Sequence, residues 1–250
     1  MKIGRTALLT ASVLGFAHMA NAEGLTDMTD AEREAFRAEV RAYLIENPEV
    51  LVEAIDALEA RQAAEQAASD GDLVAANKAA LHDTSSSWVG GNPEGDVTLV
   101  EFVDYRCGYC RKAHDEVAKL IENDGNIRLI VKEFPILGED SIESAKFAIA
   151  VLQEAGPDAY KKAHDKLITL RGKPSKGNLK GIAEELGLDG DAILAKAESP
   201  EVGQVIAENH ALAKEMQISG TPTFVMNDMM LRGYLPYDGM VQRLAMVRGE

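Results

Sequence analysis

Cys107 and Cys110 are the only two cysteines in this chain of 250 residues, and they lie in the stretch FVDYRCGYCRKAHD (102–115). A cysteine pair at this spacing can form a structural disulfide, contribute to a metal site, or react by thiol–disulfide exchange. A disulfide across so short a loop removes little entropy from the unfolded chain. Small secreted proteins are stabilised by several disulfides together, and this chain could form only one. We therefore do not expect a structural role.

A metal site would need more ligands than the cysteine pair supplies. Structural zinc is bound by four ligands, normally as two pairs at short spacing. His114 follows Cys110 by four residues, so a three-ligand site could form, but no fourth ligand stands at a suitable spacing. The other histidines after residue 22 are His82, His164 and His210. We predict no metal and no other cofactor.

The exchange hypothesis has a physical basis in the position of Cys107. This residue falls where an expected strand turns into a helix, near unpaired N–H groups and the positive end of the helix dipole. Arg106, Arg111 and Lys112 flank it and add positive potential. Both effects favour the thiolate, so we predict that Cys107 is the nucleophile. Cys110, one turn further, would resolve the mixed disulfide.

The segments around this pair predict an α/β domain. Residues 97–105 and 127–134 are short, apolar and β-branched, as in buried strands, and a helical pattern separates them. Strand, helix and strand make a right-handed, parallel βαβ unit. A strand hairpin (SGTPTFVMND and MMLRGY) and a closing helix come last, after helices expected near 141–155, 158–170, 178–186, 190–198 and 201–216. We predict one domain over 85–250, with an all-helical insert at about 139–217.

Residues 29–82 have a helical pattern of a different kind. Thr29 and Glu32 match a capping box, and Asn47-Pro48 should interrupt the helix. The apolar residues form one narrow stripe, which must pack on the main domain or on copies of itself in an oligomer. The polar stretch DTSSSWVGGNPEGD (83–96) indicates a boundary near residue 85. We therefore predict an N-terminal helical arm over 23–84, a possible oligomerisation stalk.

The first 22 residues predict a secretory signal peptide. Lys2 and Arg5 precede the apolar run ALLTASVLGFAHMA, and Ala20-Asn21-Ala22 is a small-x-small cleavage site. The run is short for a membrane span. We expect cleavage after Ala22 and a periplasmic or secreted protein, in a compartment where disulfides persist.

The charge of the chain excludes some classes of partner. Its formal net charge is -15. So acidic a surface repels phosphate, which argues against binding to nucleic acid and to anionic membranes.

Three segments together resemble the DsbA-like branch of the thioredoxin superfamily. They are GNPEGDVTLVEFVDYRCGYC, KEFPILG and SGTPTF, in this order around the helical insert. The resemblance covers about residues 85–250 and implies a thioredoxin fold with an inserted helical subdomain. The segment YLIENPEVLVEAIDALEARQ resembles the N-terminal extension of ScsC-like proteins, which supports oligomerisation in that family.

The resemblance assigns roles to residues far from the cysteines in sequence. Thr221-Pro222 matches the cis-proline loop, whose backbone pairs with an extended substrate. Glu101 matches the buried acid of the family, which relays a proton to the resolving cysteine. Lys132, on the second strand, could pair with Glu101.

The residues between the cysteines depart from the strongly oxidising relatives, which carry Pro-His there. This chain has Gly108-Tyr109. A histidine stabilises the thiolate and makes the disulfide more oxidising, and tyrosine lacks that charge. We expect a milder oxidant. Thr221 is also more similar to the residue found in disulfide isomerases.

We hypothesise a protein disulfide oxidoreductase that forms or shuffles disulfides in exported proteins. Its partners would be cysteine-containing clients, a membrane redox partner that resets the disulfide, and further copies of the chain bound through the arm. The alternative is a binding protein, a chaperone or copper-handling module with incidental cysteines. Thioethers bind Cu(I), but at strand spacing methionines such as Met226, Met229 and Met230 more often belong to a core. Whether the protein oxidises, isomerises or reduces stays open.

Overall fold

The structure is a computed structural model that describes residues 28–249. The chain divides into two compact units, one ending at Ala60 and one beginning at Arg61. The predicted signal peptide, residues 1–22, lies outside the described residues. No helix in the described range is long and apolar enough to cross a bilayer.

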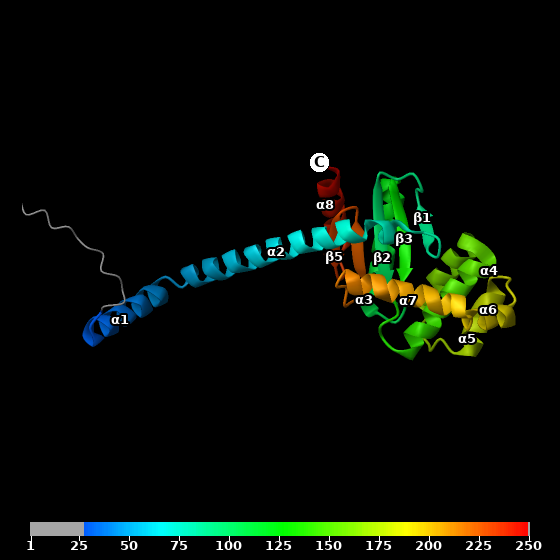
Figure 1. The fold of residues 1–250 in the computed structure, drawn as a ribbon, viewed down its shortest axis with the longest axis horizontal. Coiled ribbons are helices and arrows are strands. Elements are labelled where there is room, and N and C mark those ends of the chain that lie inside the picture. Colours follow the sequence, from blue (N-terminus) through cyan, green and yellow to red (C-terminus); the bar gives the residue numbers. More distant parts are fainter. Residues whose placement is uncertain (1–27, 250) are drawn as a thin grey trace, which may run out of the picture. The chain divides into compact units, whose positions relative to one another are not determined.

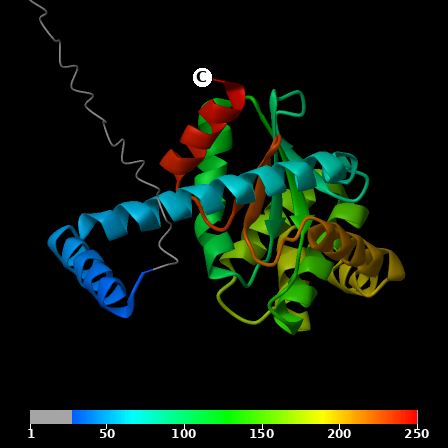
Figure 2. The ribbon, with the colours of Figure 1, turned by 60° about the vertical axis from the view of Figure 1, so that its left-hand side comes forward.

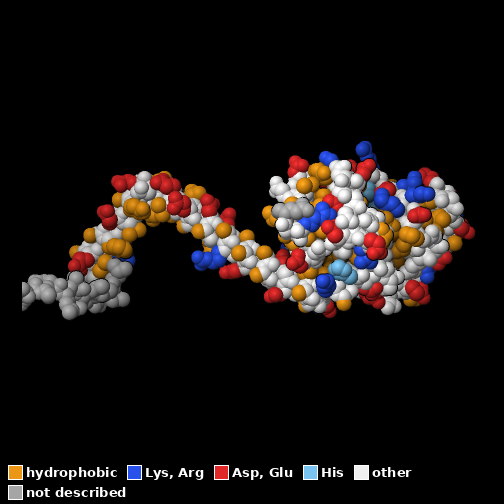
Figure 3. Space-filling model, turned by 90° about the horizontal axis from the view of Figure 1, so that it is seen from above, with side chains coloured by type: hydrophobic (Ala, Val, Ile, Leu, Met, Phe, Trp, Pro, Cys, Tyr) orange, Lys and Arg blue, Asp and Glu red, His pale blue; other side chains and the backbone are white. Residues whose placement is uncertain are grey.

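The described part of the first unit, residues 28–60, is helical. Helix α1 (Asp30–Glu46) begins with the predicted capping box, in which Thr29 Oγ1 accepts from Glu32 N at 3.4 Å and Glu32 Oε2 accepts from Thr29 N at 2.8 Å. Helix α2 (Glu49–His82) follows after the break at Asn47-Pro48, as expected. No residue of α1 is buried. Hydrophobic side chains are exposed along these helices (Figure 3), among them Phe36, Val40, Tyr43, Leu51 and Ile55.

The second unit is built on a five-stranded sheet with the order β1-β3-β2-β4-β5 (Figure 1). Strands β2 (Val97–Val103) and β3 (Ile127–Glu133) are parallel and joined by helix α3 (Gly108–Asp124), which is the predicted βαβ unit. The other neighbours, which involve β1 (Trp88–Gly91), β4 (Thr223–Met226) and β5 (Met229–Arg232), pair antiparallel.

Strand β1 lies in the stretch that we expected to be a joint. Its sequence, WVGG, is too short and glycine-rich to predict a strand, but it pairs with β3 in the register Trp88↔Val131. The indole of Trp88 is buried, stacks on Tyr160 and donates to the carbonyl oxygen of Pro157 at 3.0 Å. Sheet pairing and one buried tryptophan therefore order this segment.

The helical insert follows β3, as predicted. Helix α4 (Glu139–Thr169) is kinked at Gly156, before Pro157, where two separate helices were expected. Helices α5 (Lys176–Glu185) and α6 (Gly190–Ala197) pack on α4 beside the sheet (Figure 2), and α7 (Pro200–Glu215) leads back to β4. Helix α8 (Tyr237–Arg248) closes the domain and packs on α3. The predicted thioredoxin-type α/β fold is confirmed.

The side chains of the sheet alternate between two cores, as the period of two in a strand requires. Leu99 and Val103 pack in one core with residues of α3, α4 and α8. Val100 and Phe102 pack in the other with residues of α2 and α7. The two faces of β2 are thus buried under different helices, and all seven of its residues are buried.

The last part of the expected arm packs with the sheet domain. Val74 and Leu81 of α2 are buried in the second core. The buried carboxylate of Asp70 accepts from Arg232 Nη2 at 2.6 Å and from Arg232 Nε at 3.1 Å. These interactions explain why the second compact unit begins inside α2 and not near residue 85.

Candidate active site

Cys107 occupies the turn between β2 and α3. It is the N-cap residue of α3, with extended backbone angles (φ -72°, ψ 121°), and its N–H donates to the carbonyl oxygen of Asp104 at 3.1 Å. Its thiol donates to the carbonyl oxygen of Thr221 at 3.1 Å, and 8% of the residue is exposed. The sulfur is therefore at the positive end of a helix and close to the surface.

Asp104 holds this turn in place, a role that we did not predict. Its Oδ1 accepts from the N–H of Arg106 and from the hydroxyl of Ser141, both at 2.8 Å. Its Oδ2 accepts from the N–H groups of Ile136 and Leu137, at 2.8 and 3.1 Å. One buried carboxylate thus connects the cysteine turn to the loop after β3 and to the start of α4.

Cys110 lies one turn into α3 and is fully buried. Burial raises the pKa of its thiol, and the nearby carboxyl of Glu101 raises it further. The two cysteines are not bonded to each other. The pair therefore offers one sulfur to a partner and keeps the second behind it, in the reduced form.

The loop before β4 faces Cys107. The Thr221-Pro222 bond is cis. Because β2 and β4 are antiparallel neighbours, with Phe102 opposite Thr223, the start of β4 lies beside the end of β2. The carbonyl oxygen of Pro222 accepts from the N–H of Gly233 at 2.9 Å, which ties this loop to the end of β5.

Glu101 lies on the same face of β2 as Leu99 and Val103, toward α3. It is 4% exposed, and no group between residues 28 and 249 donates a hydrogen bond to its carboxyl oxygens. Burial raises the pKa of its carboxyl to about 7. A group with this pKa can take up and release a proton near neutral pH.

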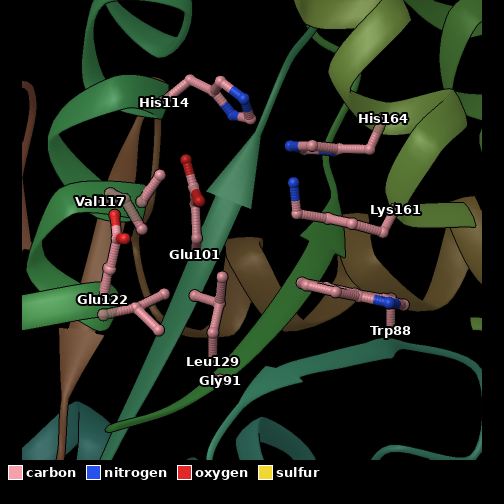
Figure 4. Close-up of a pocket in the computed structure, with 11 residues that line it drawn as sticks. Trp88, Gly91, Glu101, His114, Val117, Glu122, Leu129, Lys161 and His164 are labelled. Atoms are coloured by element: carbon pink, nitrogen blue, oxygen red, sulfur yellow. The ribbon is translucent and has the colours of Figure 1, made fainter. Parts of the chain in front are cut away.

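A cavity of about 210 Å³ reaches Glu101 from the outer side of α3. The exposed residues Ala118 and Glu122 are at its mouth, and Trp88, Val117 and Leu129 form apolar walls. Figure 4 shows the Glu101 carboxylate directed toward the imidazole of His114, with His164 and Lys161 on the opposite wall. A cavity of this volume with some polar lining residues has room for water.

Lys132 does not pair with Glu101, so that expectation was wrong. It points into the second core, on the face of the sheet opposite to Glu101, because adjacent positions in a strand alternate. Its ammonium group donates to the carbonyl oxygen of Asp83 at 2.7 Å, at the end of α2.

Two protein families match this chain. The family described as "DSBA-like thioredoxin domain" matches residues 98–245, and "Copper resistance protein ScsC N-terminal domain" matches residues 32–65. The first match covers more than half of the chain. The chain belongs to the DSBA-like thioredoxin domain family. The predicted relationship to the DsbA-like branch, with an ScsC-like N-terminal extension, is confirmed.

Solved structures support the DSBA-like assignment. A thioredoxin-like oxidoreductase from Silicibacter pomeroyi DSS-3 is 38% identical, with a TM-score of 0.64, over 70% of this chain and 99% of that one. Proteus mirabilis ScsC, in a transitional conformation, is 26% identical, with a TM-score of 0.63, over 88% of this chain and 98% of that one.

Among curated proteins, the Na(+)/H(+) antiporter NhaA 1 of Salinispora arenicola is 33% identical over 146 residues. These are 58% of this chain but only 22% of the antiporter, and the next curated relatives are spanned to a similar extent. The similarity thus concerns one part of those longer proteins.

Besides Asp104, the DSBA-like domain has another buried acid near the site that sequence reasoning missed. Glu133 Oε1 accepts from the hydroxyl groups of Tyr105, at 2.7 Å, and Tyr160. The Tyr105 hydroxyl also lies 2.9 Å from His164 Nδ1. Burial raises the pKa of Glu133 to about 8 and lowers that of His164 to about 3. Tyr105 lies two residues before Cys107, but nothing in its spacing indicates partners 28 and 59 residues away.

The residues between the cysteines differ in their surroundings. Gly108 is exposed, and a Cβ atom there would meet nothing within 4 Å. Tyr109 is 64% exposed and stacks on Tyr234, with ring centres 6.2 Å apart.

Possible metal ligands are dispersed in this structure. Residues 28–249 contain no group of three histidine, cysteine or acidic side chains placed to hold a metal ion. His114 Nε2 is 3.1 Å from Asp165 Oδ1. Met226 and Met230 are buried in the two cores of the sheet.

Proposed function

We propose that this chain is an exported protein disulfide oxidoreductase that works through Cys107 and Cys110. The position of Cys107 carries the proposal, because its sulfur is at the N-terminus of α3 and 3.1 Å from the Thr221 carbonyl oxygen. The DSBA-like match over residues 98–245 supports the same class of reaction.

The exchange proceeds through a mixed disulfide. In oxidation, a client thiolate attacks the Cys107 sulfur of the Cys107–Cys110 disulfide, and Cys110 leaves as a thiolate. A second client thiolate then attacks the client sulfur of the mixed disulfide and releases the Cys107 thiolate. Two electrons pass from the client to the pair. In the reverse direction, the Cys107 thiolate opens a client disulfide, and Cys110 resolves the product.

Glu101 is proposed to handle the proton of Cys110. The raised pKa of the buried thiol means that its thiolate is unstable without a proton source. With a pKa of about 7, the Glu101 carboxyl can donate to this thiolate or accept from the thiol. We propose that water in the cavity past His114 exchanges this proton with solvent.

Thr221 and Pro222 are proposed to bind the client. Their loop faces Cys107 and directly precedes strand β4, so its backbone can pair with an extended segment of the client. This places the client sulfur opposite the cysteine that it must join.

The arm over residues 23–84 is proposed to assemble copies of the chain. Residues 36–51 line an open apolar groove, and the ScsC N-terminal match spans residues 32–65. Several redox sites in one assembly would favour isomerisation, because a misbridged client could be held while its disulfides exchange. The periplasm is the proposed location, in line with the predicted cleavage after Ala22, and a membrane redox partner would reset the pair.

The deciding experiment is the equilibrium of the pair against glutathione. We expect a potential between those of DsbA, about -120 mV, and thioredoxin, about -270 mV, because Gly108-Tyr109 lacks a cation. A Cys107→Ala/Cys110→Ala double variant that keeps full function in disulfide formation would contradict the proposal and favour a binding protein.

A further inference from the structure

The three cations that flank Cys107 in sequence have different partners. The Arg106 guanidinium donates to the carbonyl oxygen of Gly172 at 2.9 Å, and that of Arg111 donates to the carbonyl oxygen of Leu170 at 2.9 Å. Both arginines are thus committed to the loop after α4. Lys112 is exposed and has neither an ion pair nor a hydrogen bond with any residue between 28 and 249.

Lys112 lies instead over an aromatic ring. Its ammonium nitrogen is 4.3 Å from the ring centre of Tyr234, and the exposed Tyr109 stacks on the same ring at an angle of 28°. A cation–π contact positions the ammonium group without neutralising its charge. We call Tyr109, Lys112 and Tyr234 together the client-side surface.

This surface is fixed beside the proposed client-binding loop. The N–H of Gly233, the residue before Tyr234, donates to Pro222 O at 2.9 Å. The Tyr234 hydroxyl donates to Glu116 Oε1 at 3.2 Å, and the N–H of Tyr237 donates to Glu116 Oε2 at 3.2 Å. The carboxylate of Glu116, one turn after Lys112 on α3, is therefore occupied by uncharged donors and leaves Lys112 without an ion pair.

We propose that the client-side surface binds an acidic side chain of the client, within two residues of the cysteine that joins Cys107. This inference rests on the proposed function and adds a sequence preference to it. An extended peptide advances about 3.3 Å per residue, and the hydrogen bond from Gly233 to Pro222 keeps Tyr234, and with it Lys112, next to the loop where such a peptide would lie. The tyrosine rings cover its methylene groups, and Lys112 pairs with its carboxylate. The chain as a whole has a net charge of -15, so an unpaired cation beside the site selects locally for an acidic side chain in the client.

Three reduced peptides test the preference. Each peptide contains two cysteines. The peptides differ only in the residue next to the first cysteine, which is glutamate, glutamine or lysine. The oxidised protein oxidises each peptide, and the loss of peptide thiol gives the rate. We expect Lys112→Gln to lower the ratio of the glutamate to the lysine peptide by roughly two- to fivefold, as for an exposed ion pair. Lys112→Glu should invert the preference, and salt should weaken it in the wild type.

The same three peptides are used with every protein variant, so differences in the reactivity of their thiols cancel when the rate ratios of two variants are compared. Lys119→Gln is the matched control, because Lys119 also lies over a tyrosine ring, Tyr237, at 4.1 Å, but two turns further along α3. It should keep the wild-type ratio. An equal change for all three peptides in Lys112→Gln would overturn the subsite and leave the oxidoreductase standing. Failure of the wild type to oxidise any peptide would overturn both.

Discussion

The thiol of Cys107 lies 3.1 Å from the carbonyl oxygen of Thr221, although 114 residues separate them in the chain. The antiparallel pairing of β2 with β4 brings them together, because it places the start of β4 beside the end of β2. The helical insert leaves and re-enters the domain between these strands. Cys107 thus has the proposed docking loop on one side, and Cys110 lies behind it, fully buried.

The two cysteines should therefore have unequal roles that substitution separates. We expect Cys107→Ser to reduce exchange by several orders of magnitude, because the nucleophile is lost. Cys110→Ser should instead accumulate the mixed disulfide with a client peptide, because Cys107 can still react and its resolving partner is gone. Mass spectrometry of the protein after incubation with an oxidised peptide measures both. Accumulation in Cys107→Ser and none in Cys110→Ser would reverse the assignment.

Glu101 should make the stability of the reduced protein fall as pH rises. Its folded-state pKa of about 7 exceeds the usual 4.5, so folding takes up a proton between these values. The free energy of unfolding therefore decreases across this window, by about 3 kcal/mol in total. Glu101→Gln removes this loss. The free energy of unfolding of the variant, relative to that of the wild type, should therefore rise by on the order of 3 kcal/mol between about pH 4 and pH 8. Urea unfolding at each pH measures it.

Glu122→Gln is the control for that measurement. Glu122 belongs to the same cavity but is exposed at its mouth, whereas Glu101 is buried. This variant should follow the pH dependence of the wild type. A Glu101→Gln curve parallel to the wild type would show that the carboxyl is not the titrating group.

The local part of the site could be predicted from the sequence, and the long-range part could not. The Cys107–Cys110 pair, the strand before it and the helix after it are encoded within about 25 residues, where hydrophobic period and spacing are decisive. Thr221-Pro222 and Glu101 came from resemblance to a family. The contacts of Glu133 with Tyr105 and Tyr160 depend on how α4 docks on the sheet, and no local pattern encodes that.

Two errors show where the prediction was limited. Strand β1 was missed because its WVGG sequence gains order from pairing with β3 and from the burial of Trp88. The proposed Lys132–Glu101 pair ignored the parallel register, in which Glu101 stands opposite Val131. That register places the side chain of Lys132 on the other face of the sheet, and strand period alone could not have revealed it, because the register between the two strands was not known from sequence.

The uncharged side chain of Tyr109 should give the pair a lower redox potential than a histidine at the same position would. Tyr109→His places a titratable nitrogen two residues after Cys107, where a cation stabilises the Cys107 thiolate of the reduced form. We expect the potential against glutathione to rise by roughly 30 to 60 mV, which is a ten- to hundredfold change in the equilibrium constant. Tyr109→Phe keeps the ring and adds no charge, so its potential should stay at the wild-type value. Equal shifts in both variants would attribute the effect to the lost hydroxyl.

The apolar stripe of α1 should be an interface between copies of the chain. Val40 is 41% exposed and lies in a groove with Phe36 and Leu44, while no residue of this helix is buried within the described chain. Val40→Glu should dissociate the oligomer, because burying an unpaired carboxylate costs on the order of 2 kcal/mol or more per subunit. Light scattering of the full mature chain measures the mass before and after substitution.

Ala38→Glu makes a matched control for this last prediction. Residue 38 is on the same helix and exposed, but it lies about 200° around the helix axis from Phe36. The variant adds the same charge on the side of the helix away from Phe36 and Val40, at a residue that does not line the groove, so its mass should equal that of the wild type. Since neither position is buried, the redox potential should be unchanged in both variants. A monomeric wild type would remove the proposed stalk, and dissociation by both variants would show that added negative charge, not the stripe, decides assembly.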